Sequence, residues 1–478
     1  MEKKKDYSLL LIVLIPIILY VLLTMFVPAG TFSGEFTKGE VSSLGVYGLF
    51  SSFIASFSIL AQNVFFLLCV GGLYGVLNKT GVYQKIVDFF ANENRKIMLV
   101  FTVVIFALLS SLFGGTMFVF STSSTLLGGA MITFMLLPFF VSVLIKAGYS
   151  KVSSLAATVG STLIGTFAST TGNLAFYKNY LSLDSKAYMI YNIIVLIVLI
   201  FLLCMFIIAK DKKEGKKAAA KDIPLYITSK DNKKSVVPLV IMLVIVFLLV
   251  IVGGYNWELS YGFKGFTSIH EFILGIELFK TSVFGWLFGN FSQFGIFSLV
   301  ESSVVILIAS MIISWVYSIK LSDFIESFKN GAKEMLIPSI YVVLASVIFA
   351  HIMISGSTGD ISATIINPII NMSKNFNVFT GTLTGIVGSF FFNDSLYLVN
   401  GLYGFISTFD AAKLPLIVNV LQSTFGVMMF VLPVSVLLVG GLRYLNVSYK
   451  EWIKYIWIFI LQIFAISVIG NVILSMII

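Results

Sequence analysis

Long apolar runs recur along the chain and are separated by short polar segments. At 1.5 Å per residue, about 20 helical residues cross the roughly 30 Å hydrocarbon layer of a bilayer. Runs of about that length cover residues 9–26, 57–78, 187–208, 236–252, 304–319, 415–438 and 453–477. The pattern predicts an all-α polytopic membrane protein whose first run is retained as a helix.

Two polar islands interrupt apolar sequence, one in each half of the chain. The first, between apolar arms 96–120 and 126–145, contains Ser121, Thr122, Ser123, Ser124 and Thr125. The second, between arms 336–353 and 361–371, contains Ser355, Gly356, Ser357, Thr358 and Asp360. Polar groups at membrane depth are unfavourable unless they line a cavity or meet partners. Each island is therefore predicted to be the tip of a re-entrant hairpin, although isolated hydroxyls would only tighten helix packing.

Each island is followed by an apolar helix that small and polar residues interrupt. In the first half, the segment from Val152 to about Ala175 contains Ser169, Thr170, Thr171, Gly172 and Asn173. In the second half, the segment after Gly388 contains Asn393, Asp394, Asn400 and Gly401. Discontinuous helices at corresponding places in two halves are the best sequence indication of a transporter binding site. These residues are our candidates for substrate or ion binding.

The order of these elements divides the chain into two related repeats. Residues 1–209 form the first, with its hairpin at about 96–146, and residues 235–478 form the second, with its hairpin at about 336–373. If a further span crosses the membrane at about 274–290, the repeats are inverted, whereas without it both hairpins open to the same side. We favour inversion because it gives one site with access from both sides.

Composition supports a membrane protein and excludes several other classes. Hydrophobic residues make up 58% of the 478 residues, charged residues only 11%, and the mean hydropathy is +1.01. The net charge of +9 comes largely from lysines beside apolar runs, above all in the 210–234 linker, so no nucleic-acid partner is needed. By the positive-inside rule, this linker and the N-terminus are expected in the cytoplasm, in a multi-pass protein of the cell (plasma) membrane. Two cysteines and two histidines predict no disulfide and no certain metal site.

The acidic candidates indicate a role in binding a cation. An acid within a membrane segment is functional by default, although Asp360 or Asp394 at an aqueous mouth would only be solvated. As carboxylates they can coordinate Na⁺, exchange a proton or bind an ammonium group, and they repel a dicarboxylate unless neutralised. We interpret His351 as a packing residue, with a proton carrier as the alternative.

These features predict a secondary active transporter of a small carboxylate-bearing metabolite, working in the lipid bilayer without a cofactor. An amino acid, in basic amino-acid exchange, is slightly favoured over a dicarboxylate, and Na⁺ or H⁺ is the expected coupling ion. A membrane-embedded enzyme or a channel is the alternative of another class. The sequence shows no nucleophile with its base, no nucleotide-binding loop and no short pore-forming repeat, so the enzyme and channel hypotheses are weaker.

Several short motifs resemble a known family. Val76-Leu-Asn-Lys-Thr-Gly81, Val27-Pro-Ala-Gly30 and the hairpin pair are similar to the YfcC-type branch of the anaerobic dicarboxylate-carrier family, in the ion-transporter superfamily. The resemblance implies a scaffold, a mobile transport domain with elevator-type motion, four-carbon dicarboxylates or basic amino acids as substrates, and a homodimer. The chain departs from that pattern at Ser123-Ser124, where relatives usually carry paired acids, and at Thr171-Gly-Asn173, where they tend to have Asn-Pro. A proline that they carry near Val399 is also missing.

Overall fold

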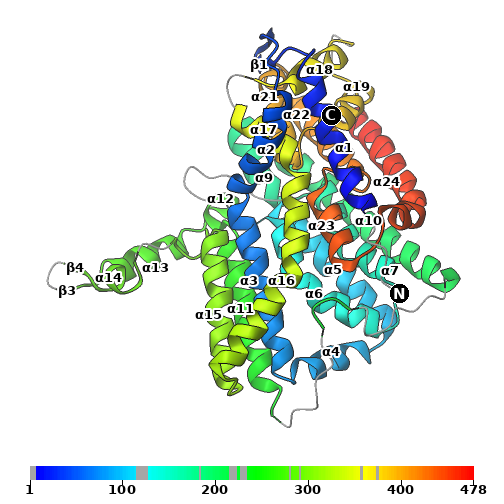
Figure 1. The fold of residues 1–478 in the computed structure, drawn as a ribbon. Coiled ribbons are helices and arrows are strands. Elements are labelled where there is room, and N and C mark those ends of the chain that lie inside the picture. The colour runs from blue at the N-terminus through cyan, green and yellow to red at the C-terminus, as the bar shows by residue number, and fades with distance from the viewer. Residues whose placement is uncertain are drawn as a thin grey trace.

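The structure is a computed structural model that describes residues 7–114, 128–181, 183, 185–214, 223–226, 234–278, 281–289, 292–355, 359–372 and 376–477. Helices make up most of these residues, and the strands among them form two short antiparallel pairs. Within this part of the chain, eight helices are long and apolar enough to cross a membrane, or ten if each of two bent helix pairs counts as one span. The predicted all-α polytopic class is confirmed (Figure 1).

The first part of the chain contains one outer helix, a small hairpin and a long return. Its elements are α1 (Ser8–Leu23), β1 (Gly30–Ser33), β2 (Glu35–Lys38), α2 (Gly45–Ile59), α3 (Ala61–Lys79) and α4 (Tyr83–Ala91). Helix α3 corresponds to the span predicted at 57–78, and only Leu60 separates it from the shorter apolar helix α2. Exposed Phe50, Ile54 and Phe57 give α2 an apolar outer face, as expected for a helix against lipid.

The next elements contain the predicted first hairpin and the first interrupted helix. They are α5 (Arg95–Phe113), α6 (Gly129–Lys146), α7 (Lys151–Leu155), the π-helical turn η1 (Ala156–Gly160), α8 (Ser161–Phe167), α9 (Thr171–Leu181) and α10 (Ser185–Glu214). Helices α5 and α6 pack against each other. The helix from Lys151 to Phe167 meets α9 at a bend of 40°, which confirms the interrupted helix predicted at 152–175.

The second half begins with a spanning helix and an arm and ends in a set of short helices. Its elements are α11 (Val237–Gly254), α12 (Trp257–Tyr261), α13 (Gly265–Leu274), β3 (Glu277–Leu278), β4 (Thr281–Ser282), α14 (Val283–Phe288), α15 (Leu299–Val316), α16 (Leu321–Ala345), α17 (Val347–Ser355), α18 (Ile361–Ile370), α19 (Val378–Gly388), α20 (Ser395–Gly401), α21 (Tyr403–Ile406), the 3₁₀ turn η4 (Ala411–Lys413), α22 (Leu414–Met428), α23 (Val436–Leu445) and α24 (Tyr449–Ile477).

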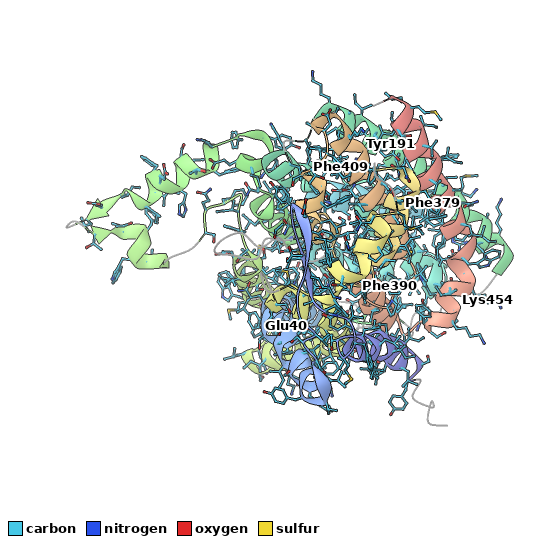
Figure 2. All side chains as sticks on the ribbon, turned by 90° about the horizontal axis from the view of Figure 1, so that it is seen from above. Glu40, Tyr191, Phe379, Phe390, Phe409 and Lys454 are labelled. Carbon is cyan, nitrogen blue, oxygen red and sulfur yellow. The ribbon has the colours of Figure 1, made fainter. Side chains whose placement is uncertain are left out.

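The segment between α11 and α15 projects sideways as an arm, which Figures 1 and 2 show from the side and from above. It contains α12, α13, α14 and the β3–β4 pair, and no residue of α12 or α13 is buried. The span considered at 274–290 is therefore replaced by a two-stranded turn and a six-residue helix. Such a helix is too short to cross a bilayer.

Helices α3 and α16 pack with their backbones almost in contact. A Cβ atom on Gly71 would lie 2.4 Å from the carbonyl oxygen of Gly331, and one on Gly75 would lie 2.1 Å from that of Ser327. Small residues permit this close approach between membrane helices. The two helices therefore form one rigid unit.

The second hairpin differs in position from the prediction. The arms expected at 336–353 and 361–371 lie in α16, α17 and α18, and α16 bends by 50° into α17 at Ser346. Helix α17 packs mainly on α2, whereas α18 packs on β1 and α19. Further along, α19 and α20 are joined by residues 389–394, and we refer to this pair as the second hairpin. A Cβ atom on Gly388 would lie only 2.3 Å from the side chain of Leu398.

With that hairpin placed at α19–α20, the two halves contain matching sets of elements. In the first set α5 and α6 are followed by the interrupted helix α8–α9 and by α10; in the second, α19 and α20 are followed by α22–α23 and by α24. Helices α22 and α23 are separated by residues 429–435, so the predicted span 415–438 is also interrupted. Figure 1 shows α6 in the lower part of the molecule and α19 in the upper part.

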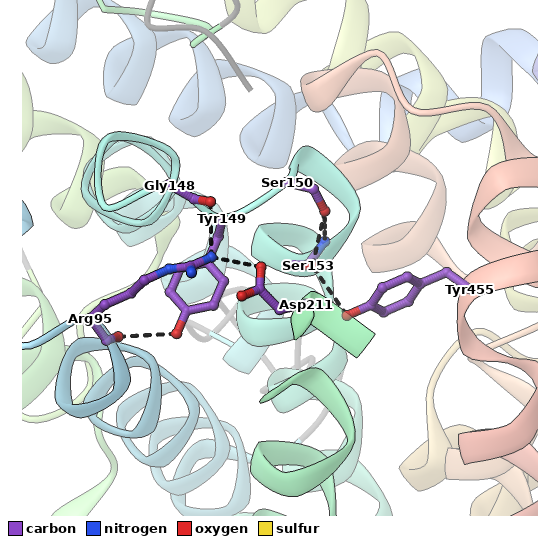
Figure 3. Close-up of polar contacts among 7 residues, drawn as sticks. All are labelled: Arg95, Gly148, Tyr149, Ser150, Ser153, Asp211 and Tyr455. Atoms are coloured by element: carbon purple, nitrogen blue, oxygen red, sulfur yellow. Dashed lines mark hydrogen bonds and ion pairs between the residues drawn. The ribbon is translucent and has the colours of Figure 1, made fainter. Parts of the chain in front are cut away.

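An ion pair ties together the ends of the first set of helices (Figure 3). The Arg95 guanidinium donates to Asp211 at 2.6 Å and to the Gly148 carbonyl at 2.9 Å. The Cζ atom of the Arg95 guanidinium lies 4.0 Å from the centre of the Tyr149 ring. The Tyr149 hydroxyl donates to the Arg95 carbonyl. On the same side, Ser153 and Tyr455 lie in hydrogen-bond contact at 3.2 Å. The starts of α5 and α24 and the end of α10 are thereby held around the α6–α7 turn.

Candidate functional site

The break between α8 and α9 is stabilised by the neighbouring helix α5. Where the helix unwinds at 168–170, its backbone groups lose their helical partners and need others. The Ser111 hydroxyl donates to the Ala168 carbonyl at 2.8 Å, and the Thr170 N–H donates to the Ser111 carbonyl at 3.0 Å. The interruption is therefore stabilised by specific hydrogen bonds from α5.

A buried glutamine from the second half reaches the same break. The Gln422 amide on α22 donates to the Phe167 carbonyl at 3.2 Å and lies 3.4 Å from the Ser169 carbonyl. Its Oε1 atom lies 2.8 Å from the Tyr188 hydroxyl, which is itself 2.7 Å from the Ser169 carbonyl. Both side chains are fully buried. The break is thus held by residues that are more than 200 positions apart in the chain.

Asn173, in the first turn of α9 after the break, connects the break to the tip of the second hairpin. Its amide donates to Ser395 at 3.1 Å and to Gln422 at 3.2 Å. Beside Ser395, Asp394 begins α20, and its carboxylate accepts the Leu396 N–H at 2.9 Å. Asp394 is only 1% exposed. A buried carboxylate therefore stands next to the point where the two halves meet.

The end of the first arm of the first hairpin, at Gly114, lies at the same place. Gly114 has a positive φ of 58°. A Cβ atom on Gly172 would lie 1.9 Å from the Gly114 nitrogen. Glycine is required at both positions, because one adopts a left-handed conformation and the other permits backbone contact. Residues 115–127, including the predicted tip residues Ser121 to Thr125, lie outside the described part of the chain.

Tyr177 adds a hydroxyl group to this cluster. It is fully buried on α9, close to Asn173, Ser395 and Asp394. Among the described residues its hydroxyl oxygen has no hydrogen bond of good geometry. Buried polar atoms are normally paired, so an unpaired hydroxyl at such a position is suited to an incoming ligand.

The amide cluster continues away from the break between α10, α22 and α24. Asn192 donates to Asn419 at 2.7 Å, and on the other side Asn471 donates to Ser423 at 2.9 Å. All four residues are buried. Such neutral groups bind a carboxylate or an ion without adding charge to the membrane interior.

The remaining first-half candidates lie at the break itself. Ser169 and Thr170 are buried, and the Thr171 hydroxyl lies 3.0 Å from the hydroxyl of Tyr255, which follows α11. A ring contact of 5.2 Å between Phe113 and Tyr255 continues this interface. The break is therefore also the point at which the first set of helices touches the α11 region.

The candidates around Asp360 occupy a different place. The Asp360 backbone pairs with Gly30 of β1 through two hydrogen bonds of 3.0 and 3.3 Å, and its carboxylate caps α18 at the Ser362 N–H. This residue lies outside the spanning helices, and burial raises the pKa of its carboxyl while the Ser362 N–H opposes that rise. Ser355 donates to the carbonyl of His351, and Gly356, Ser357 and Thr358 lie outside the described residues.

Of the other second-half candidates, one is buried at a helix bend and two are exposed. Asn393 is buried and donates to Ser346, at the α16–α17 bend, at 2.9 Å. Asn400 and Gly401 are exposed at the end of α20. His351 makes a ring contact with Tyr20 at 5.8 Å, as a packing residue does. Among the predicted residues, the structure brings together Ser169 to Asn173 and Asp394.

Sequence reasoning missed four residues of this cluster: Ser111, Tyr177, Tyr188 and Gln422. Asn419, Gln422 and Ser423 recur at helical spacing inside the apolar run 415–438, so they share one face of α22. That polar face in a spanning segment was a detectable signal. The tyrosines gave none, because tyrosine is common in membrane helices for other reasons.

The described residues contain no group of three His, Cys, Asp or Glu side chains able to hold a metal ion. The cluster offers neutral donors from Asn173, Tyr177 and Ser395 beside one acidic side chain. It has no nucleophile activated by a base, so its chemistry suits binding.

A sequence model described as "DcuC: C4-dicarboxylate anaerobic carrier" matches residues 7–476 of this chain. No curated protein matches it. Among solved structures, the YdaH transporter of Alcanivorax borkumensis, described as having an unusual topology, shares 12% identity with it and a TM-score of 0.40. That similarity covers 98% of this chain and 97% of the other.

Proposed function

Because the chain belongs to the C4-dicarboxylate anaerobic carrier family, and is thus a membrane transporter, we propose that it is a secondary active carrier of a small carboxylate-bearing metabolite. The observation that supports this proposal most directly is the meeting of two helix interruptions. The Asn173 amide at the first break donates to Ser395 at the second hairpin tip and also to Gln422. Discontinuous helices that converge from two repeats are the usual construction of a carrier's binding site.

The groups at this junction suit a ligand that carries both charges. A carboxylate accepts a hydrogen bond from the Tyr177 hydroxyl and gains from the positive end of the α9 dipole. An ammonium group, or a coupling Na⁺, is stabilised by the buried carboxylate of Asp394. An amino acid satisfies both requirements, so we favour it as the substrate.

A dicarboxylate is the second candidate, and the family relationship supports it. Its second carboxylate would lie near Asp394 in a buried setting, where like charges repel strongly. Binding would then require that Asp394 be protonated or paired with Na⁺. A dicarboxylate carrier should therefore depend strongly on pH or on Na⁺.

We propose an elevator-type movement for transport. The rigid α3–α16 unit would remain in place, and the elements around the break would move relative to it together with the bound substrate. The contacts of Tyr255 with Thr171 and Phe113 would be broken and remade in each cycle. Exchange of this kind needs no nucleotide, and the sequence has no nucleotide-binding loop.

Uptake into proteoliposomes tests the proposal. Labelled arginine, ornithine, succinate and a neutral amino acid are compared, each with and without a Na⁺ or pH gradient, against empty liposomes. Saturable uptake of an amino acid supports the favoured substrate, and saturable uptake of succinate alone supports the second. The absence of saturable uptake of all four would contradict the transporter proposal.

Asp394→Asn separates the two substrates, because asparagine keeps the size of the side chain and its capping oxygen. For an amino acid, loss of the charge should raise KM at least tenfold, about 1.4 kcal/mol. For a dicarboxylate, it should preserve uptake and remove its dependence on pH or Na⁺. Asn400→Asp is a matched control, since Asn400 is exposed and outside the cluster.

A further inference from the structure

A cavity lies away from the helix breaks, at the end of the molecule near α4. It has a volume of about 1240 Å³ and is bounded by the ends of α3 and α23 and by one face of α16. None of the residues of the break lines it. It therefore belongs to a different part of the molecule from the proposed substrate site.

Part of the lysine-rich linker forms one wall of this cavity. Ile223, Pro224, Leu225 and Tyr226 all line it, and we name this segment the clasp. Ile223 is 4% and Leu225 8% exposed, values typical of core residues. Connecting segments ordinarily run over the surface. Buried apolar side chains within a polar linker therefore indicate that this part of it packs against the helices.

The clasp is held by specific hydrogen bonds to three helices. The buried amide of Asn78 on α3 donates to the Leu225 carbonyl at 2.7 Å. The Tyr444 hydroxyl on α23 donates to the Pro224 carbonyl at 3.3 Å. Lys146, at the end of α6, donates to the Tyr226 hydroxyl at 2.7 Å and lies 5.0 Å from the centre of its ring.

Leucine 225 adopts an unusual backbone conformation in the clasp. Its φ of +51° lies in the left-handed region, which a leucine occupies only when surrounding contacts enforce it. The Asn78 bond and the burial of the Leu225 side chain supply such contacts. The contacts thus hold Leu225 in a conformation that an unconstrained linker rarely adopts.

The three helices meet where two groups of helices pack together. Helix α3 is joined to α16 by backbone contact, and α6 and α23 both pack on α7 and η1, in the interrupted helix. Helix α23 also packs on α16, and α6 on α3, so the clasp lies at an interface between the two groups. If α6 and α23 move with the interrupted helix relative to α3, either the Asn78 bond or those of Tyr444 and Lys146 must break. The clasp thus adds its own bonds to this interface and restrains that movement.

We propose that the ends of α3, α6 and α23 form a peptide-binding site whose ligand is the chain's own Ile223–Tyr226, and that docking of the clasp slows the transport cycle. The binding site stands on the contacts alone, whereas the effect on rate rests on the proposed transport function. Release of the clasp removes its bonds to α3, α6 and α23 and speeds the movement.

Photo-crosslinking in the full-length protein tests docking independently of transport. p-Benzoylphenylalanine replaces Tyr226, and after irradiation the crosslinked peptides are identified by mass spectrometry. Crosslinks to α3, α6 or α23 are expected. The same probe at Tyr261, which is 58% exposed on the arm, is the control and should give none to these helices. Absence of crosslinks from position 226 to the three helices overturns the binding site.

Initial uptake rates test the effect of the clasp. Leu225→Asp places a charge in the apolar part of the cavity and should raise the rate at least twofold, whereas Thr228→Asp adds the same charge to the same linker and should leave it unchanged. Leu225→Gly is a second variant that removes the side chain but adopts the left-handed backbone easily. A rate for both Leu225 variants equal to or below that of Thr228→Asp overturns the restraint.

The two assays separate the proposals. If the wild-type protein takes up none of the four substrates, the transport function fails, and crosslinking still decides whether the clasp docks. If uptake is saturable but unaffected by the Leu225 variants, the transport function stands and only the restraint fails.

Discussion

Replacing Gly172 by alanine tests the meeting of the first hairpin with the helix break. The new Cβ would lie 1.9 Å from the Gly114 nitrogen and 2.3 Å from the Phe113 carbonyl carbon. Both are backbone atoms, so no side chain can rotate away to make room. Ordinary contact begins at 3.4 Å, so α5 and α9 would have to separate by the difference, 1.5 Å.

The size of the effect follows from this displacement. Overpacking of a well-packed site destabilises by about 1–3 kcal/mol, and contact with backbone places Gly172→Ala near the upper end, about 3 kcal/mol. The shift also moves Asn173, whose bonds to Ser395 and Gln422 are 3.1 and 3.2 Å long. Loss of their geometry adds about 1 kcal/mol for each bond. We expect a lower thermal midpoint in detergent and a KM for uptake raised at least tenfold.

Gly160→Ala is the matched control for this substitution. Gly160 lies in the same segment, but its nearest neighbour would be 3.7 Å from the new Cβ. There alanine should stabilise the helix by about 1 kcal/mol, because it restricts the unfolded chain more than glycine does. Thermal unfolding of monodisperse protein and uptake are measured for both variants. Equal midpoints for Gly172→Ala, Gly160→Ala and wild type would refute the reasoning.

Three further predictions concern other contacts. Gln422→Leu should lower the thermal midpoint by the equivalent of about 1–3 kcal/mol, because it removes the hydrogen bonds of Gln422 to the Phe167 carbonyl and to the Asn173 amide. A midpoint equal to wild type would show that the Gln422 amide is dispensable. Arg95→Lys should destabilise the protein by about 1–2 kcal/mol, because lysine cannot donate to Asp211 and to the Gly148 carbonyl in the planar geometry of a guanidinium group. The double variant with Asp211→Asn should lose less stability than the sum of the losses of the two single variants. Burial raises the pKa of the Asp360 carboxyl, so the folded protein binds this proton more tightly than the unfolded chain does. The free energy of unfolding should therefore rise as the pH falls from the pKa of the folded state towards that of the unfolded state. A pH series of thermal midpoints should show this gain in the wild type but not in Asp360→Asn.

The first break could be predicted because Ser169 to Asn173 form an unusual polar run in an apolar segment, and the α5 groups that satisfy it lie within 60 residues. The second hairpin could not be placed in the same way. Asp360 and Asp394 are each the cap of a short helix and look alike in sequence. Their roles diverge through distant partners, which are Gly30 for one and the Asn173 cluster for the other.

The arm and the clasp show a second limit. Aromatic and charged residues alternate between 255 and 296 without a clear period, so neither helix nor strand was evident there. The lysines of the 210–234 linker indicated a solvated segment, and they concealed four apolar residues whose partners lie on three other helices. In both regions the structure depends on tertiary contacts that local sequence does not encode.

The π-helical turn at Ala156–Gly160 sets the angular position of everything after it. One residue more than an α-helical turn requires is accommodated there, and each residue rotates a helix by about 100°. Thr162 and Thr166 thereby face Thr133 and Ser110, at 2.7 and 3.2 Å. Deletion of a single codon in this turn would restore regular winding and point both threonines, and the unwound residues beyond them, at different neighbours.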